Sequence, residues 1–166
     1  MQLPGSKTVR EVALGSETCF STNIRWLIRR DIPTILKIEE RSFDQMTAED
    51  IITNLRQRNT IGMVIEHEEE IVGWMAYEHH KNHIHIIKLE VLDVKRGTGF
   101  GTLMIEKLKS KLNERKSCLT MMVDETNLIG QLFLRSNEFK AVSIEKDWAE
   151  SGVDGIFFRF RNSRTE

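Results

Sequence analysis

The sequence predicts a single domain of the α/β class, in which helices flank a β-sheet. The chain has 166 residues, 40% of them apolar and 30% charged, which is enough for one hydrophobic core and too little for two. Short β-rich runs alternate along it with segments whose apolar residues recur at helical spacing. A glycine-rich joint at residues 96–101 connects an apolar run to one of these amphipathic segments. Together these observations predict strands and helices that share one core.

Charge and cysteine content narrow the class of protein. The 24 Lys and Arg residues nearly balance the 25 Asp and Glu residues, for a net charge of -1, so no overall field would attract nucleic acid or an anionic membrane. Cys19 and Cys118 lie far apart without a CxxC pattern, which predicts free thiols in a reducing compartment. There is no run of 18 apolar residues and no basic-then-apolar leader. We therefore expect a cytoplasmic protein without a membrane partner.

The two ends of the chain are expected to lie outside the domain. Residues 1–22 mix Gly, Ser, Thr and charged residues with only one short apolar cluster, at residues 12–14. Such a segment cannot bury a face of its own and is predicted to be a flexible tail, which could also bind a partner or occupy the domain's own cleft. The predicted domain spans residues 23–162, and residues 163–166 form a C-terminal tail.

The first elements of the domain carry start signals. Residues 24–28 read as a strand. Asp31 offers an N-cap oxygen and Pro33 follows in the first turn, where a missing N–H costs nothing, so a helix is predicted over residues 32–41.

A second helix is predicted after Thr47. Thr47 and Asp50 have the spacing of a capping box, with Asp in place of Glu. The residues that follow place an apolar stripe on one helix face: Ile51, Ile52 and Leu55.

Three consecutive strands are predicted next, over residues 60–66, 71–80 and 83–91. The acidic link at residues 67–70 joins the first two, and a Lys81–Asn82 turn joins the last two, since Asn tolerates the positive φ of a tight hairpin.

Four of the five histidines lie between His79 and His85. His83 and His85 share one strand face, which raises the possibility of a metal site. No carboxylate or thiolate stands nearby at a ligand spacing, so we expect no metal and favour a catalytic role for one histidine over a metal site, with a hairpin histidine that has no role as the alternative.

The joint at residues 96–101 is predicted to bind an anion. The first amides of a helix have no intrahelical acceptor and, with the helix dipole, form a site for phosphate, and three glycines let the backbone approach its ligand. A P-loop would need Gly-Lys-Ser/Thr, and a Rossmann loop would follow the first strand and precede an acidic residue about 20 positions on, so both fit poorly. An ordinary turn that caps the helix remains an alternative.

The rest of the chain continues the pattern. A helix is predicted over residues 99–114, a strand over residues 117–123, and a helix from Thr126–Asn127 to Ser136. Two final strands are predicted over residues 139–145 and 155–161, with a polar link between them.

Two motifs in this second half resemble a known family. Arg96, Gly99 and Gly101 form Arg-x-x-Gly-x-Gly between an apolar strand and a helix, and residues 124–139 look like the segment where the same family carries an Asn and a helix. The chain thus resembles the GNAT N-acetyltransferase superfamily from about residue 24 to residue 161, closest to the ribosomal-protein alanine N-acetyltransferases. The resemblance implies a mixed, mostly antiparallel sheet that is splayed around acetyl-CoA.

The resemblance also implies where the substrates bind. The strand before the loop would pair its backbone with the pantetheine arm, the loop would cradle the pyrophosphate, and Asn127 would contact the cofactor near its reactive end. The implied cofactor residues are Leu89, Glu90, Val91, Arg96, Gly97, Thr98, Gly99, Phe100, Gly101, Thr102, Asn127 and Leu134. Phe43 and Met46 would line the acceptor side.

The chain departs from the family at the positions that move protons. The family's glutamate base falls on Met122 and its tyrosine acid on Leu134, and neither residue can carry a proton. In this sequence Asp93 replaces the proline that the family usually has before the loop, and Glu138 replaces the family's closing glycine. Some N-terminal acetyltransferases use a base at the position of His85, which could act at neutral pH. Asp124 is a weaker candidate.

The predicted function is transfer of acetyl from acetyl-CoA to a primary amine, with a protein N-terminus as the first choice of acceptor. Direct attack would need positioning, a polarised thioester carbonyl, a base and an acid. A non-catalytic acyl-CoA-binding domain is the rival from another class, because of Met122 and Leu134. A small-amine acetyltransferase is a third possibility, which predicts an acidic acceptor cleft drawn from Glu66, Glu68, Glu69 and Glu70.

Overall fold

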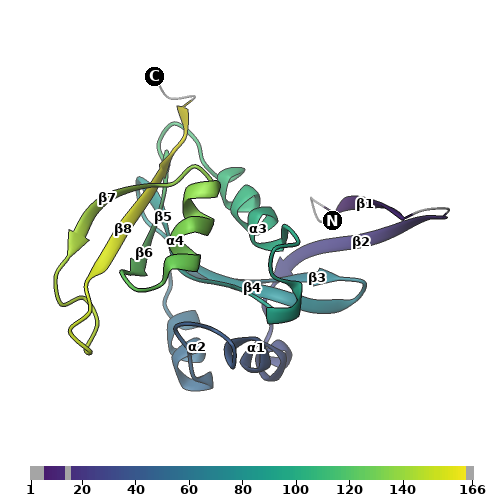
Figure 1. Ribbon diagram of the computed structural model, residues 1–166, viewed down its shortest axis with the longest axis horizontal. Helices are drawn as coiled ribbons and strands as arrows, with labels where there is room; N and C mark the ends of the chain where they lie inside the picture. The colour runs from purple at the N-terminus through teal and green to yellow at the C-terminus, as the bar shows by residue number, and fades with distance from the viewer. Residues whose placement is uncertain (1–5, 14–15, 164–166) are drawn as a thin grey trace.

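The computed structural model describes the backbone of residues 6–13 and 16–163, and side chains from residue 21 onward. Its described part is one eight-stranded sheet with helices on both faces (Figure 1). The strand order is β1-β2-β3-β4-β5-β6-β8-β7, and every neighbouring pair is antiparallel except β5 and β6, which are parallel. The predicted α/β class with a mixed, mostly antiparallel sheet is confirmed.

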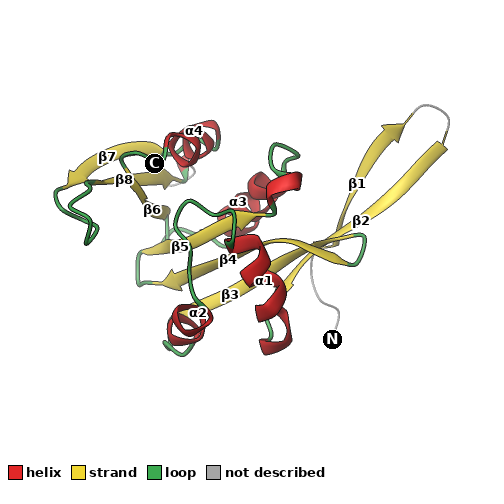
Figure 2. Cartoon of the chain, turned by 60° about the horizontal axis from the view of Figure 1, so that its bottom comes forward, coloured by secondary structure: helices red, strands yellow, loops and turns green. Residues whose placement is uncertain are grey.

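The N-terminal segment differs from the prediction. Strands β1 (Ser6–Ala13) and β2 (Ser16–Trp26) pair in antiparallel register along the whole of β1, from Ser6 opposite Asn23 to Ala13 opposite Ser16. Only Thr22–Trp26 of β2 also pairs with β3, so the rest of the hairpin extends beyond the sheet, as Figures 1 and 2 show. The prediction of a tail without secondary structure over residues 1–22 is therefore wrong for the described part. That prediction rested on the small number of apolar residues that the segment could bury. It took no account of strand propensity, which is high for the β-branched residues of this segment.

The domain limits of 23–162 stay a prediction. Residues 1–5 and 14–15 of the expected N-terminal tail lie outside the described residues, as do residues 164–166 of the expected C-terminal tail.

Two short helices cover one face of the sheet. A 3₁₀ turn (Arg29–Asp31) leads into α1 (Ile32–Glu39), and α2 (Ala48–Leu55) follows. The predicted capping box of α2 is confirmed, because Thr47 Oγ1 accepts from Asp50 N at 3.1 Å and the Asp50 carboxylate accepts from Thr47 N at 2.9 Å.

Asp31 does not cap α1 with its side chain, contrary to prediction. Its carboxylate turns back and accepts from Ile28 N at 2.8 Å and from both terminal nitrogens of Arg25 at 2.8 and 2.9 Å. The Arg25 hydrogen bond lowers the pKa of Asp31. A bidentate ion pair satisfies this carboxylate better than one more amide would.

The three central strands form as predicted. They are β3 (Thr60–His67), β4 (Glu70–His79) and β5 (His83–Val91). The positive φ angles of tight hairpins are found at Glu68 and Glu69, not at Asn82 as expected. A register shift opposite Ala76 and Tyr77 leaves Ile87 of β5 unpaired, so the strand carries a bulge there.

The second half contains the remaining elements. A 3₁₀ turn (Asp93–Lys95) precedes α3 (Phe100–Lys109), and β6 (Cys118–Asp124), α4 (Leu128–Ser136), β7 (Lys140–Glu145) and β8 (Gly155–Arg161) follow. Helix α3 ends five residues earlier than the predicted 114, because the chain after Ser110 tightens into turns. Helix α4 begins next to the predicted Thr126–Asn127, and Asn127 is its N-cap.

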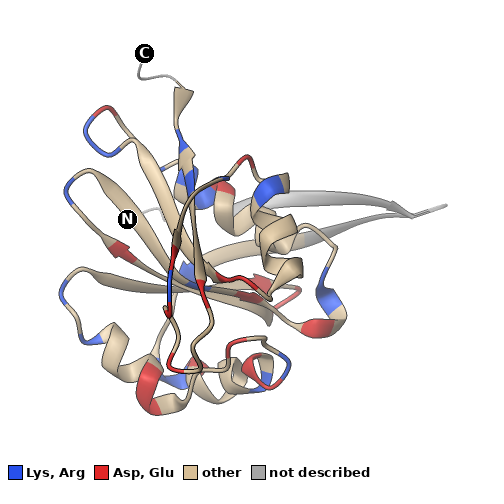
Figure 3. Cartoon of the chain, turned by 60° about the vertical axis from the view of Figure 1, so that its left-hand side comes forward, with Lys and Arg blue, Asp and Glu red and all other residues tan. Residues whose placement is uncertain are grey.

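The sheet is buried on both faces at β3 and β4, so buried residues follow one another along these two strands without alternation. On the α1–α2 face, Trp74 and Ala76 of β4 pack with Ile35 and Ile38 of α1. On the α3 face, alternate residues of the same strand join the larger cluster, which includes Met75, Tyr77, Ile84, Ile86, Met104, Leu108, Leu134 and Phe158. None of the described helices is both long and apolar enough to span a membrane. Figure 3 shows basic and acidic residues of the described chain distributed together over the ribbon.

Candidate active site

The site begins where two neighbouring strands separate. The parallel ladder between β5 and β6 ends at the pair Ile86 and Met121, although β5 continues to Val91 and β6 to Asp124. Beyond that pair, the edge of β5 has no strand beside it on the β6 side. Two cavities of about 670 and 520 Å³ open along this split.

The larger cavity, called the loop cavity here, lies against the glycine-rich loop and the start of α3. Gly97 and Gly99 have φ of 74° and 92°, and a Cβ added to either would meet nothing within 4 Å. The first helical hydrogen bond runs from Leu103 N to Gly99 O at 3.0 Å, so the amides of residues 100–102 have no partner within the helix. An open cradle with such amides fits a phosphate-bearing ligand.

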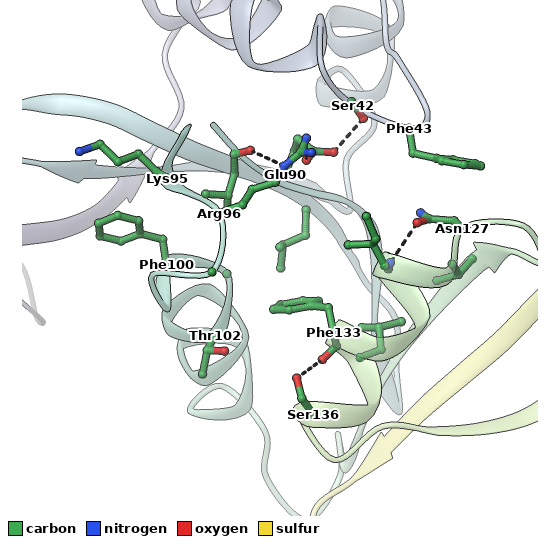
Figure 4. Close-up of a pocket in the computed structure, with 18 of the residues that line it drawn as sticks. Ser42, Phe43, Glu90, Lys95, Arg96, Phe100, Thr102, Asn127, Phe133 and Ser136 are labelled. Atoms are coloured by element: carbon green, nitrogen blue, oxygen red, sulfur yellow. Dashed lines mark hydrogen bonds and ion pairs between the residues drawn. The ribbon is translucent and has the colours of Figure 1, made fainter. Parts of the chain in front are cut away.

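The structure brings together almost all the residues that the sequence assigned to a cofactor. They line the loop cavity, except Thr98, whose hydroxyl donates to Lys95 O. Figure 4 shows this arrangement, with Phe100 and Thr102 on α3 and Asn127, Phe133 and Ser136 on or next to α4. The residues that reasoning from sequence missed are Arg41, Ser42, Lys95, Met121, Val123, Ile129, Gly130, Phe133 and Ser136.

Two of the assigned residues have structural partners of their own. Asn127 Oδ1 accepts from Gly130 N at 2.9 Å and so caps α4. Leu134 is 1% exposed and belongs to the core as well as the cavity wall. A role of either in binding a cofactor stays a prediction.

Arg96 turns its guanidinium away from the loop amides. Its Nη2 donates to Glu90 Oε1 at 3.0 Å and to Arg41 O at 2.7 Å, and its Nη1 lies 3.2 Å from Asp93 Oδ1. Glu90 in turn accepts from Ser42 Oγ at 2.8 Å, as Figure 4 shows. The arginine of the motif therefore ties the loop to the segment that follows α1.

The smaller cavity, called the acceptor cavity here, lies between that segment and the loop that joins β7 to β8. Phe43 and Met46 line it, and Trp148 lines it from the other side. That Phe43 and Met46 contact an acceptor stays a prediction. Phe43 is 57% exposed and also lines the loop cavity. Seven residues line both cavities: Ser42, Phe43, Leu89, Glu90, Met121, Val123 and Asn127.

His85 lies in the acceptor cavity. Its Nδ1 is 2.9 Å from Thr120 Oγ1, and its ring stacks on Phe157 with centroids 6.5 Å apart. Burial lowers the pKa of His85 below its usual value, and Glu78 opposes this only in part. The imidazole is therefore neutral at pH 7, the form in which a histidine can accept a proton.

The other histidines of this stretch have partners at the far end of the strands. His79 Nδ1 is 2.9 Å from Lys116 Nζ, His80 Nε2 is 2.8 Å from Glu78, and His83 Nδ1 is 2.8 Å from Asn82. Within the described residues, no three His, Cys, Asp or Glu side chains form a group that could hold a metal ion.

Three further residues that matter for proton transfer also line these cavities. They are Asp124, the weaker candidate base, and Met122 and Leu134, which stand where the resemblance expects a base and an acid. Asp124 lines the acceptor cavity, but its Oδ1 accepts from Thr126 N at 2.7 Å and from Thr126 Oγ1 at 2.6 Å in a local turn. Met122 lines the acceptor cavity and Leu134 the loop cavity. Neither cavity is lined by the acidic run at residues 66–70, and Glu66 instead binds Arg25 Nε at 2.8 Å.

A buried lysine is part of the site that no pattern in the sequence predicted. Lys88 is 5% exposed and lies 3.2 Å from Glu39, which is 2% exposed. Its Nζ donates to Ser42 Oγ at 2.7 Å and to Asp44 O. Simple alternation along β5 would place Lys88 with Ile84 and Ile86, but the bulge turns it to the opposite face.

Comparison with known proteins agrees with this geometry. The family model described as acetyltransferase (GNAT) family matches residues 23–139. No curated protein matches the sequence significantly.

Among solved structures, the chain is similar in fold to the ribosomal-protein-S18-alanine N-acetyltransferase from Escherichia coli, at 17% identity, with a TM-score of 0.72 over 86% of this chain and 94% of that one. Ard1 from Thermoplasma volcanium gives 16% identity and a TM-score of 0.75 over 85% and 97%. An acetyltransferase from Bacillus anthracis, solved in complex with acetyl coenzyme A, gives 13% identity and a TM-score of 0.69 over 85% and 99%.

The family model covers well over half of the chain, and the fold agrees with it throughout that range. The class of enzyme expected from the sequence, a GNAT-type N-acetyltransferase dependent on acetyl-CoA, is confirmed at the level of the family. The chain belongs to the acetyltransferase (GNAT) family.

Proposed function

We propose that this protein transfers the acetyl group of acetyl-CoA to a protein N-terminal amine by direct attack. The observation that carries the proposal is that the loop cavity and the acceptor cavity share one wall at the open edge of β5. Two reactants held in these cavities would meet there, and positioning alone accounts for much of the rate of such a reaction.

The residues of the loop cavity fit coenzyme A. The amides of residues 97–102 would hold the diphosphate, and the unpaired edge of Leu89, Glu90 and Val91 would hold the pantetheine arm. When bound, acetyl-CoA supplies the activated acyl group. The chain itself contributes orientation, backbone N–H groups near the acyl carbonyl, and an apolar wall that excludes water.

His85 is the proposed base. The attacking amine must be neutral, so an ammonium has to lose one proton to the base before attack, and the nitrogen loses a second proton as the C–N bond forms and the C–S bond breaks. When Nδ1 carries the ring hydrogen and donates to Thr120 Oγ1, Nε2 is the proton acceptor. Asp124 is a second candidate for the base. It is less suitable, because its Oδ1 already accepts two hydrogen bonds from Thr126 in a local turn. The leaving thiolate would take its proton from water, because no ionisable side chain stands at the position of Leu134.

A protein N-terminus is favoured over a small polyamine for two reasons. The structures of similar fold include an enzyme named ribosomal-protein-S18-alanine N-acetyltransferase, a name that gives a protein as the acceptor. The acidic run that would attract a polyamine, residues 66–70, lies outside both cavities. Cytoplasmic residence is part of the same proposal, and the oligomeric state does not enter it.

The test is to follow free thiol release from acetyl-CoA with a panel of peptides that differ in their first residues, with spermidine as the small-amine comparison. Turnover with peptides that is lost when the peptide N-terminus is blocked supports the proposal. Turnover with spermidine alone would show that the acceptor is a small amine and not a protein N-terminus. Binding of acetyl-CoA without turnover on any acceptor would favour the non-catalytic alternative.

A further inference from the structure

A chain of polar contacts joins the glycine-rich loop to helix α1. Arg96 Nη2 donates to Glu90 Oε1 at 3.0 Å, and Glu90 Oε2 accepts from Ser42 Oγ at 2.8 Å. Ser42 Oγ accepts from Lys88 Nζ at 2.7 Å, and Lys88 lies 3.2 Å from Glu39. These five residues are called the Glu39–Arg96 network below.

The network is largely removed from water. Glu39, Lys88 and Ser42 are 2%, 5% and 9% exposed, and the Glu90 side chain is 16% exposed. Charged hydrogen bonds at such depth are stronger than those on a surface, and leaving one partner unpaired is costly. Their arrangement therefore fixes the elements that carry them.

Those elements are the glycine-rich loop, where coenzyme A is proposed to bind, and the segment that lines the acceptor cavity. The segment at residues 40–47, which carries Phe43 and Met46, is held at four points. Arg96 binds its Arg41 carbonyl, Lys88 binds its Asp44 carbonyl, and Ser42 Oγ lies within the network. Glu39 accepts from its Met46 amide at 2.8 Å.

Glu90 occupies the central position of this network. Of the described residues that line both cavities, it is the only ionisable one. One of its carboxylate oxygens faces Arg96 of the loop, and the other faces Ser42 of the acceptor wall. Asp93 also binds Arg96, at 3.2 Å, but it contacts only the loop and lines neither cavity.

We propose that Glu90 is a positioning residue for the transfer reaction. Through its side chain, occupancy of the glycine-rich loop by coenzyme A holds the acceptor wall, residues 40–47, in place. The role of the Glu90 side chain is separate from that of its backbone at the open edge of β5. The inference rests on the proposed function, because it requires that coenzyme A binds at the loop.

Hydrogen exchange of the full-length protein, followed by mass spectrometry with and without coenzyme A, tests this. In the natural sequence, coenzyme A should slow exchange at residues 97–102 and also at residues 40–47. Glu90→Gln keeps the shape of the side chain and removes its charge. In this variant coenzyme A should still slow exchange at the loop. The factor by which it slows exchange at residues 40–47 should fall roughly tenfold or more, the loss expected for one charged hydrogen bond.

Asp93→Asn is the matched control, since it removes the other carboxylate partner of Arg96 and should leave both effects intact. If Glu90→Gln does not fold, Ser42→Ala breaks the next contact of the network and should give the same selective loss. A purely structural network would raise exchange at residues 40–47 equally with and without coenzyme A.

The outcomes separate this inference from the proposed function. Slowing at the loop alone in the natural sequence, or unchanged slowing at residues 40–47 in Glu90→Gln and Ser42→Ala, overturns the positioning role and leaves the proposed function standing. No effect of coenzyme A on either segment overturns both.

Discussion

Ile86 and Met121 form the last pair of the only parallel ladder among the described strands, and β5 and β6 separate directly beyond them. Five residues of β5 continue past this point with a free edge on that side, next to the glycine-rich loop that opens α3. The split in the sheet and the cradle of amides are thus neighbours in space because they are consecutive in sequence.

Replacing His85 with Gln should lower kcat/KM by about 10² to 10⁴, the usual contribution of a general base. Burial lowers the pKa of His85, so the neutral, active form predominates at pH 7. The rate of the natural enzyme should therefore rise with pH through a value below 6.5 and level off at neutral pH. The variant should lack this rising limb in a pH profile of kcat/KM.

His83→Gln is the matched control for that change. Burial lowers the pKa of His83 in the same direction, but it stacks on His80 and lines neither cavity. A full rate with the same pH profile is expected. If His85→Gln kept both the rate and the limb, the base would have to be another group, with Asp124 next in line.

Replacing Glu39 with Ala should destabilise the fold by about 3–5 kcal/mol, because it leaves the buried ammonium of Lys88 without its nearer charged partner, with only Glu90 at 4.0 Å remaining. The same change removes the acceptor of the Trp74 indole N–H, at 2.8 Å. Urea unfolding followed by circular dichroism measures the effect. Glu40→Ala, at an exposed neighbouring position, should change stability little. Equal effects of the two changes would show that the buried pair is not a source of stability.

Glu138 follows α4 with a φ of 71°, a conformation that glycine adopts without cost and other residues rarely adopt. Glu138→Gly should therefore raise Tm by about 2–4 °C. The change also removes an exposed ion pair with Lys109, at 2.8 Å, which contributes little. Glu138→Ala removes the same ion pair and keeps the constraint on φ, so it should give no gain. A rise for both variants would show that the side chain, and not the backbone, is responsible.

Much of the fold follows from local patterns. Apolar periodicity and the Thr47–Asp50 capping box located the helices, and apolar runs located the six strands from β3 to β8. The glycines predicted the part of the loop cavity around residues 96–101, because a loop binds its ligand with consecutive backbone groups. The roles of Leu89, Glu90, Val91, Asn127 and Leu134 came from family resemblance. The acceptor cavity is assembled from segments far apart in sequence, and Phe43 and Met46 came only from family resemblance.

Three features needed the three-dimensional structure. The bulge at Ile87 reverses the alternation of β5, so no sequence period places Lys88 beside Glu39. Trp148 reaches the acceptor cavity from a polar link that carries no signal of its own. The N-terminal hairpin forms by backbone pairing outside the main sheet, which a search for buried faces does not detect.

Calorimetric titration of the protein with coenzyme A, compared between Gly99→Ala and Gly152→Ala, tests the central claim most directly. Both glycines have positive φ, at 92° and 77°, so both changes strain the backbone alike, but only Gly99 lines the loop cavity. We predict that the natural protein and Gly152→Ala bind coenzyme A equally, and that Gly99→Ala binds it at least about tenfold more weakly, because the added methyl group and the backbone strain fall on a residue that lines the loop cavity. Unchanged affinity in Gly99→Ala, or no binding by the natural protein, would contradict the account.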